Sequence, residues 1–203
     1  MTAVSRQRSH VTNTLKVLAG IAAFALTALS SQGSVVGTKL ENFQLADSSG
    51  KTHSLNQYKG KVVILCFWSF KCPVSLAYDK RLEELEEQYR AKGVVVLGID
   101  SNSDETAEAV QKNAAGLNLG YPILLDSQGT VADRLGATHS PSVFILDREF
   151  IVRYEGMIDN GNRPGEKGRE AYAEQALDSI LAGRQVPVAV TKGGGCSIKR
   201  QSF

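Results

Sequence analysis

The sequence predicts an α/β fold in which buried strands alternate with helices along the chain. Two continuous apolar runs, Val62–Phe67 and Val94–Ile99, are bounded by turn-forming residues, which is typical of strands at the centre of a sheet. Between these runs, apolar residues recur at helical spacing over residues 76–90, at Tyr78, Leu82, Leu85 and Tyr89. Since strand and helix patterns follow one another in this way, we expect a sheet covered by helices.

The other elements can be placed from the same patterns. Short alternating runs around a glycine-containing turn predict a β-hairpin over residues 43–55. A second helix is expected from about residue 102 to 117, a strand over 121–125, and a short helix that begins with a capping box at Thr130 and ends at Gly136. A second hairpin joins residues 143–146 to 150–154, and a last helix covers residues 169–181.

The first 31 residues are predicted to lie outside this fold. Arg6, Arg8 and Lys16 precede a short apolar run of 13 residues, Val17–Leu29, and no acidic residue occurs before Glu41. A basic start followed by such a run is typical of a cleaved secretory signal peptide. The run is short for a membrane span, which needs about 20 residues, so cleavage is favoured over an uncleaved N-terminal anchor.

The rest of the chain is long enough for one domain with its own core. We expect this domain over residues 32–183 and a flexible C-terminal tail, which carries Cys196, over residues 184–203. Without the N-terminal segment, 20 basic residues stand against 21 acidic ones, so no basic excess points to nucleic acid. The protein is therefore predicted to be exported and to be periplasmic or secreted, with membrane anchoring by the N-terminal segment as the alternative.

Cys72 lies where the first buried strand ends and the first helix begins. A helix N-terminus carries partial positive charge and free backbone N–H groups, and both favour the reactive thiolate over the thiol. Lys71 adds a full positive charge beside it, and Pro73 suits the first helical turn because its missing N–H would have no partner there. Cys72 is therefore predicted to be a redox nucleophile, with a structural cysteine as the alternative.

The chain has three cysteines, so one is left over if the other two pair. Cys66 lies inside an apolar strand and is predicted to be a small buried hydrophobe. Cys196 follows Gly193, Gly194 and Gly195 in the predicted tail. It is interpreted as a resolving cysteine for Cys72, with an incidental thiol or a link to another chain as alternatives.

Several motifs together resemble the thioredoxin-like superfamily. They are Gly60-Lys61-Val62-Val63 at the strand entry, Phe67-Trp68-Ser69 before Cys72-Pro73, and Ser140-Pro141 before the second hairpin. The additional strand and helices before Pro141 are similar to the redoxin branch, which includes alkyl-hydroperoxide-reductase/thiol-specific-antioxidant (AhpC/TSA) proteins and exported TlpA/ResA-like thioredoxins. The resemblance covers roughly residues 36–183.

This resemblance implies a three-layer α/β/α fold with a central mixed sheet, an N-terminal β-hairpin and a redoxin-type insertion. It also implies that the peptide bond before Pro141 is cis and that this loop lies beside Cys72, where its backbone edge can pair with an incoming thiol substrate. The loop over residues 156–168, which contains Asp159, Asn160 and Arg163, is then expected to border Cys72 as well.

The active-site pattern departs from both branches. Exported thioredoxins carry C-x-x-C, but Ser75 stands at the second cysteine position, so a local disulfide cannot form. Peroxiredoxins resemble P-x-x-x-T-x-x-C, and this chain has Leu65 and Ser69 at the first two of those positions. Ser69 can supply the hydroxyl of that motif, but the proline is missing. A two-cysteine cycle therefore requires Cys196 to resolve Cys72.

We predict a thiol oxidoreductase or thiol peroxidase that acts through Cys72 and reduces peroxides or exchanges protein disulfides. Its reductant is expected to be a thioredoxin-like protein or a membrane electron donor, and the oligomeric state stays open. Trp68 is expected to pack in the core beside the site. Ser75 is expected to donate a hydrogen bond to the Cys72 thiolate or to be simply a small helix residue.

Two readings without catalysis stay open. One is a copper-binding protein that uses Cys72, His139 and Cys196, since thiolate and imidazole suit copper. The other is a structural role in which Cys72 and Cys196 form a permanent disulfide. No cofactor is predicted for the catalytic reading.

Overall fold

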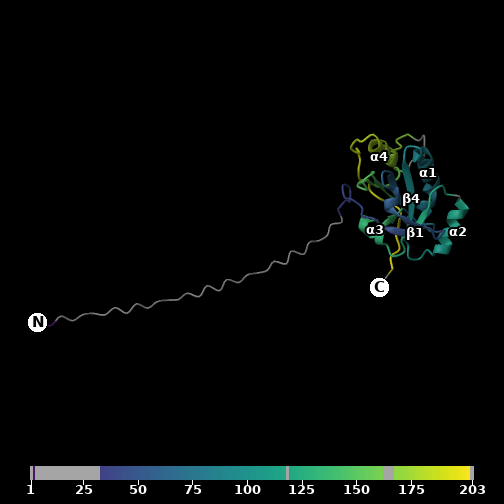
Figure 1. Cartoon of the computed structure of the whole chain (residues 1–203), viewed down its shortest axis with the longest axis horizontal. Helices are drawn as coiled ribbons and strands as arrows, with labels where there is room; N and C mark the ends of the chain where they lie inside the picture. Colours follow the sequence, from purple (N-terminus) through teal and green to yellow (C-terminus); the bar gives the residue numbers. More distant parts are fainter. Residues whose placement is uncertain (1, 3–32, 118, 162–166, 202–203) are drawn as a thin grey trace. The chain divides into compact units, whose positions relative to one another are not determined.

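A computed structural model of the chain describes residues 2, 33–117, 119–161 and 167–201 (Figure 1). Apart from residue 2, the predicted signal segment lies outside the described residues, and so does Arg163. The chain divides into two units, residues 1–31 and 32–203, and every element described below belongs to the second. No helix in the described ranges combines the length and the apolar character that crossing a membrane requires.

A mixed sheet of five strands, counted over the described residues, forms the centre of this second unit. The strand order is β5-β4-β3-β7-β8. The strands are β3 (Val62–Trp68), β4 (Val94–Asp100), β5 (Ile123–Leu125), β7 (Ser142–Leu146) and β8 (Val152–Gly156). β3 pairs in parallel with β4 and antiparallel with β7. All residues of β3 are buried, as its continuous apolar run predicts, because both faces of the sheet are covered.

Apolar clusters lie on both faces of the sheet. The helices are α1 (Pro73–Arg90), α2 (Ala107–Leu117), α3 (Thr130–Leu135) and α4 (Tyr172–Leu181). Successive residues of β3, such as Ile64 and Leu65, belong to different clusters, because successive side chains of a strand point to opposite faces. One cluster includes apolar residues of α1, α2 and α4, and the other includes those of α3. This arrangement confirms the predicted α/β/α layers.

The N-terminal hairpin is present as predicted. β1 (Gln44–Ala46) pairs antiparallel with β2 (Thr52–Ser54), and a 3₁₀ turn, η1 (Leu55–Tyr58), follows. One helix start and one helix cap differ from the expectation. α2 begins at Ala107, about one turn later than predicted. α3 has Gly129 at its N-cap rather than Thr130, because the Asp126 carboxylate already accepts the free N–H groups of the first turn.

The C-terminal segment differs from the expectation of a flexible tail. Two residues, Cys196–Ser197, form β9 and pair antiparallel with β6 (His139–Ser140). Earlier in the segment, the N–H of Thr191 donates to the carbonyl of Glu155 in β8, at 3.0 Å. Figure 1 shows the yellow C-terminal segment running back along the fold from α4. These backbone contacts hold the segment against the sheet and bring Cys196 to the start of α1.

Candidate functional site

Cys72 lies at the junction that the sequence predicts, directly before α1. It is the N-cap residue with an extended backbone (φ −93°, ψ 113°), and Pro73 begins the helix. Its carbonyl accepts the first helical hydrogen bond, from the N–H of Leu76 at 3.1 Å. The Cys72 side chain is almost fully buried, with 1% of the residue exposed. The positive end of the α1 dipole therefore acts on this sulfur with little screening by water.

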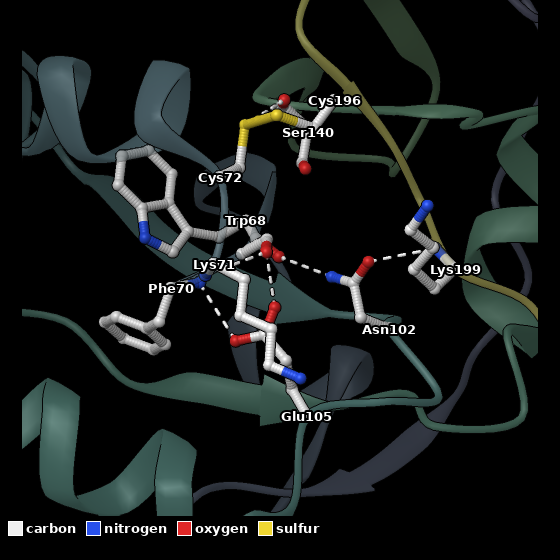
Figure 2. The surroundings of a disulfide bond; sticks show 10 residues. Trp68, Phe70, Lys71, Cys72, Asn102, Glu105, Ser140, Cys196 and Lys199 are labelled. Carbon is white, nitrogen blue, oxygen red and sulfur yellow. Dashed lines mark hydrogen bonds between the residues drawn. A yellow bond between two sulfur atoms is a disulfide. The ribbon is translucent and has the colours of Figure 1, made fainter.

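Cys72 and Cys196 form a disulfide bond in this structure (Figure 2). They are 124 residues apart in the sequence, and their Cα atoms are 5.9 Å apart, within the range of ordinary disulfides. The two cysteines differ in exposure, because Cys72 is buried whereas Cys196 is only partly so. Figure 2 shows Cys196 on the C-terminal segment, facing the start of α1.

The loop before Pro141 lies against the same sulfur. The Ser140–Pro141 peptide bond is cis, as the resemblance implies. The Ser140 carbonyl oxygen lies 3.2 Å from Cys72 Sγ, and Ser140 pairs with Cys196 across the β6–β9 ladder. The backbone edge that was expected to receive an external thiol substrate is therefore occupied by the chain's own Cys196.

A carboxylate that the sequence analysis did not single out shapes the turn before Cys72. The Glu105 side chain accepts a hydrogen bond from the hydroxyl of Ser69 and another from the N–H of Phe70, at 3.0 Å (Figure 2). The Ser69 hydroxyl in turn accepts from the N–H of Lys71, at 3.2 Å. In this oxidised form the Ser69 hydroxyl therefore donates to Glu105, whereas its backbone carbonyl accepts from the N–H of Cys72, at 3.3 Å. A peroxidase role for its hydroxyl stays a prediction.

Lys71 is held to one side of the disulfide by a surface contact. Its ammonium group lies 3.2 Å from an oxygen of the Asp104 carboxylate and also donates to the Asp104 carbonyl. The Lys71 side chain is 58% exposed, so this pair is screened by solvent. The predicted effect of Lys71 on the Cys72 thiolate stays a prediction.

Asn102 connects the end of β3 to the C-terminal segment. Its amide nitrogen donates to the carbonyl of Trp68, at 3.3 Å, and its amide oxygen accepts from the N–H of Lys199, at 3.0 Å (Figure 2). The N–H of Ser103 donates to the Lys199 carbonyl, at 2.9 Å. These bonds hold the C-terminal segment at a point after Cys196 in the sequence, so the disulfide is not the only attachment of the segment.

Asp100 is a buried carboxyl group beside this link. It is 3% exposed and pairs with Trp68 in the parallel ladder of β3 and β4. One carboxyl oxygen accepts two hydrogen bonds from Asn102, and the other has no partner among the described residues. Burial raises the pKa of Asp100 to about 7, although the bonds from Asn102 act in the opposite direction. Asp100 can therefore change charge near neutral pH.

Trp68 and Ser75 are both buried around Cys72. Trp68 is 1% exposed and belongs to the apolar cluster between the sheet and α1, which agrees with the expectation of core packing. The Ser75 hydroxyl is fully buried and has no hydrogen-bond partner among the described residues. An unsatisfied donor one turn along the helix from Cys72 is available to a thiolate there, so that role of Ser75 stays a prediction.

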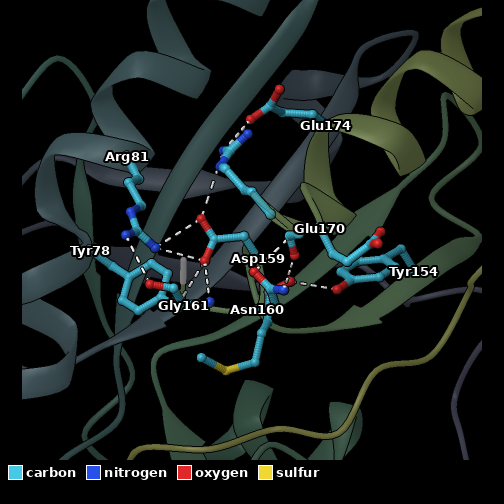
Figure 3. A network of polar contacts seen from close by, with 11 residues as sticks. Tyr78, Arg81, Tyr154, Asp159, Asn160, Gly161, Glu170 and Glu174 are labelled. Carbon is cyan, nitrogen blue, oxygen red and sulfur yellow. Dashed lines mark hydrogen bonds and ion pairs between the residues drawn. The ribbon is translucent and has the colours of Figure 1, made fainter. Parts of the chain in front are cut away.

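The loop after β8 is anchored to α1 further from Cys72 than expected. Asp159 is 1% exposed, and its carboxylate accepts hydrogen bonds from the Tyr78 hydroxyl at 2.9 Å and from Arg81 at 2.7 Å (Figure 3). Burial, together with the bond to Asp159, raises the pKa of Tyr78 to about 12. Asp159 is thus a structural anchor between the loop and the second turn of α1.

The third cysteine is buried, as predicted. Cys66 has no exposed surface and does not form a disulfide. Burial, with a contribution from the negative charge of Asp79, raises the pKa of the Cys66 thiol well above its usual range. Cys66 is therefore a poor nucleophile. The described residues contain no group of three or more His, Cys, Asp and Glu side chains that could hold a metal ion.

Comparison with known proteins places the chain in a family. The sequence profile of the AhpC/TSA family matches residues 36–158. The chain belongs to the AhpC/TSA family. It is also 31% identical, over 120 residues, to the thiol-disulfide oxidoreductase ResA of Bacillus thuringiensis subsp. konkukian, with 59% of this chain and 68% of that protein covered. It is 30% identical, over 117 residues, to the thioredoxin-like protein YneN of Bacillus subtilis, with 58% and 68% covered.

A solved structure supports the fold. The crystal structure of a hypothetical protein from Sinorhizobium meliloti superposes with a TM-score of 0.75 and 28% sequence identity, covering 84% of this chain and 97% of that one. With the family match and the named relatives, the chain is a thiol oxidoreductase of thioredoxin-like fold. The AhpC/TSA match ends at residue 158, so it does not include Cys196.

Proposed function

We propose that this protein is an exported thiol–disulfide exchange enzyme in which Cys72 attacks a disulfide of a protein partner and Cys196 resolves the product. The observation that carries the proposal is the pairing of Cys72 with Cys196 at the N-terminus of α1, beside the cis Ser140–Pro141 bond. A buried sulfur at a helix N-terminus favours the thiolate. The likeness to a named thiol-disulfide oxidoreductase supports the same chemistry.

In the first half of the cycle, the two cysteines supply both electrons that reduce the partner's disulfide. The Cys72 thiolate attacks one sulfur of the partner's disulfide, which forms a mixed disulfide and releases the partner's other cysteine as a thiolate. The Cys196 thiolate then attacks Cys72 Sγ. This step forms the observed Cys72–Cys196 disulfide and releases the partner's second thiolate, so the partner gains two electrons.

The exposure of the two sulfurs predicts the direction of the reductive half. Cys72 is 1% exposed, whereas Cys196 is partly exposed, so a reductant thiolate reaches Cys196 first. Attack at Cys196 Sγ breaks the disulfide and releases Cys72 as a thiolate. The helix N-terminus stabilises that leaving group, which accelerates the step. The reductant is therefore expected to form its mixed disulfide with Cys196.

Export is part of the proposal. Residues 1–31 carry the features of a secretory signal peptide, and a cycle through a disulfide is compatible with an oxidising compartment. In that setting the two electrons that reset the enzyme come from a thioredoxin-like thiol protein or a membrane electron donor. N-terminal sequencing of the protein from membrane and soluble fractions distinguishes cleavage from retention as an anchor.

The test compares cysteine variants in the reduction of a protein disulfide such as that of insulin. Cys72→Ser is expected to lower the rate at least a hundredfold, and Cys196→Ser to accumulate a mixed disulfide between Cys72 and the substrate. Cys66→Ala is the matched control, since that thiol is buried outside the proposed cycle, and it is expected to keep the rate. Full activity of Cys72→Ser would exclude the mechanism.

Peroxide reduction is the second candidate, because the chain belongs to the AhpC/TSA family. The local pattern is less favourable to it, since Leu65 stands where a peroxidase proline is expected and the Ser69 hydroxyl donates to Glu105. Hydrogen peroxide consumption by the reduced protein is measured beside the insulin assay. A rate constant for peroxide that exceeds the one for the protein disulfide would reassign the activity.

A further inference from the structure

The segment around Cys196 binds the fold as an added β-strand. Ser197 pairs with His139, and Cys196 pairs with Ser140. One residue further, the N–H of Ile198 donates to the carbonyl of Thr138, at 2.9 Å. This is the geometry in which an extended peptide adds to the exposed edge of a sheet, with backbone bonds supplying affinity and alternate side chains supplying specificity.

The side chains of this strand alternate as that geometry requires. Ser197 and Lys199 are exposed, whereas Ile198 is only 7% exposed and belongs to the apolar cluster that includes Leu135 and Ala137. Two residues after Ile198, Arg200 lies 2.9 Å from the Asp133 carboxylate and donates to the carbonyl of Ala137, at 3.2 Å. The fold therefore contacts the cysteine and the side chains two and four positions after it.

The position directly before the cysteine requires glycine, because the backbone there lies very close to a neighbouring carbonyl group. A Cβ atom on Gly195 would lie 2.2 Å from the carbonyl oxygen of Ser140, and the φ of Gly195 is +131°, which side chains rarely adopt. On the opposite wall, a Cβ atom on Gly129 would lie 1.9 Å from the guanidinium of Arg200. The backbone contact at Gly195 therefore fixes the position before the cysteine, whereas the flexible Arg200 side chain can move away at Gly129.

The family resemblance already implies that a thiol substrate pairs with the backbone beside Pro141. We propose that residues 195–200 are a tethered competitor for that substrate on this surface, which we call the β6 groove (residues 129, 133, 135 and 137–140). We also propose that the groove selects the side chains around the partner's cysteine. The favoured partner segment is extended. It carries glycine before the reactive cysteine, an aliphatic residue two positions after it and a basic residue four positions after it. This inference rests on the proposed function, because it requires Cys72 to be the attacking group.

The exchange step fits this arrangement. In the reduced protein, residues 195–200 leave the groove and a partner strand takes their place, with its cystine sulfur where Cys196 Sγ lies. The Cys72 thiolate attacks that sulfur, the partner's S–S bond breaks, and the partner's second cysteine departs as a thiolate. When residues 195–200 return, Cys196 attacks Cys72 Sγ and the partner segment is released. The same segment therefore both resolves the intermediate and competes with substrate.

The test uses the full chain with Cys196→Ser, reduced, and peptides of the sequence of residues 193–201 whose cysteine carries a thionitrobenzoate group. Attack by Cys72 on the peptide sulfur releases coloured thionitrobenzoate, so the rate constant is read directly. The matched peptide is expected to react at least tenfold faster than a peptide with aspartate in place of the isoleucine. Rate constants within twofold of one another would overturn the proposal.

Reversing the charge at Asp133 gives a second test of the proposal. It carries little risk to folding, since the Asp133 side chain is 72% exposed. Asp133→Arg, added to the Cys196→Ser chain, is expected to reverse the preference between the matched peptide and one with glutamate in place of the arginine, by about threefold. An unchanged preference would contradict the proposal that the groove favours a basic residue four positions after the cysteine.

Competition is tested in the same assay. Ile198→Asp, added to the Cys196→Ser chain, removes the buried anchor of the tethered segment and is expected to raise the rate constant of the matched peptide at least fivefold. An unchanged rate constant would show that the segment and the peptide do not share the groove. Reaction of Cys72 with every peptide at one rate defeats this inference alone, whereas no reaction beyond that of a Cys72→Ser, Cys196→Ser chain defeats the proposed function.

Discussion

Two cysteines that are six residues apart are predicted to differ in reactivity because of where they lie in the fold. Cys66 and Cys72 are both buried, but Cys66 lies within β3 among apolar side chains, where burial disfavours its thiolate. Cys72 lies at the end of the strand, where the N-terminus of α1 favours the charged form. The sequence distinguishes them because the apolar run stops before Cys72.

This contrast predicts the alkylation of the reduced protein. Iodoacetamide at pH 7 is expected to modify Cys72 in the Cys196→Ser chain at least a hundredfold faster than Cys66, because alkylation requires the thiolate. Peptide mapping by mass spectrometry over time gives both rates. Comparable labelling of the two residues in the folded protein would contradict the assignment of Cys72 as the activated thiol.

Asp100 predicts a pH dependence of stability. Its pKa rises from 3.8 to about 7 on folding, so the folded protein binds this proton more tightly than the unfolded chain. The contribution of the protonated Asp100 to the free energy of unfolding is therefore fully present below pH 4, and it is lost as the pH rises through 7. Asp100→Asn keeps an oxygen for the Asn102 bonds and cannot ionise. It is expected to raise the melting temperature more at pH 8 than at pH 5, as measured by calorimetry at both values.

The matched control for this measurement is Asp104→Asn, which changes a carboxyl on the same segment whose side chain is 48% exposed. That variant is expected to change the melting temperature by a similar small amount at pH 5 and pH 8. If Asp100→Asn gave the same shift at both pH values, the carboxyl of Asp100 would not be the titrating group.

At the scale of elements, the sequence predicts the sheet and its helices well because their patterns are local. Continuous apolar runs predict β3 and β4, apolar residues at helical spacing predict α1, and Gly136 ends α3 with a φ of +66°. The start of α3 at Thr130 is confirmed, but its capping box is not, since the carboxylate that accepts the free N–H groups, Asp126, lies outside that pattern.

The strand β9 was not predicted, and the reason is physical. It has two residues, Cys196–Ser197, and its partner β6 lies more than 50 residues earlier, so no local period marks it. The contacts of Asn102 and Glu105 were missed for the same reason, because each joins segments that are far apart in the sequence. The signals that were present are Gly195 directly before Cys196 and the apolar Ile198 two residues after it.

Gly195 gives a prediction for this element. Gly195→Ala forces a side chain against the Ser140 carbonyl at a φ of +131°, which costs about 1–3 kcal/mol. The equilibrium constant for forming the Cys72–Cys196 disulfide from glutathione is therefore expected to fall about tenfold. Gly194→Ala is the matched control, because a Cβ atom there has no neighbour within 4 Å among the described residues. Equal effects of the two substitutions would contradict the docked geometry of β9.

At the scale of the whole molecule, one covalent bond closes most of the domain. The Cys72–Cys196 disulfide joins residues 124 positions apart, and a loop of this length restricts the unfolded chain strongly. Reduction is expected to lower the free energy of unfolding by about 4 kcal/mol, as measured by urea denaturation with and without dithiothreitol. Dithiothreitol is expected to leave the Cys196→Ser chain unchanged, and a decrease there would point to another cause.

The docked segment also links the redox state to the accessibility of the site. With the disulfide closed, residues 195–200 cover Cys72 and occupy β6, so the oxidised protein presents Cys196 to a reductant. After reduction, the segment is still held by hydrogen bonds to the Thr138 carbonyl, the Asn102 side chain and the N–H of Ser103, and by the contacts of Ile198 and Arg200. Such bonds contribute about 1 kcal/mol each, so the segment can exchange with a partner strand.

The central claim is that the Cys72–Cys196 disulfide is a working redox couple rather than a permanent link. It is tested most directly by equilibrating the wild-type protein with glutathione buffers of graded potential and counting thiols by mass spectrometry after alkylation. A catalytic couple is expected to titrate as one two-electron step between about −270 and −120 mV, the range of thiol oxidoreductases. A disulfide that stays closed below about −300 mV would be structural and would contradict the account.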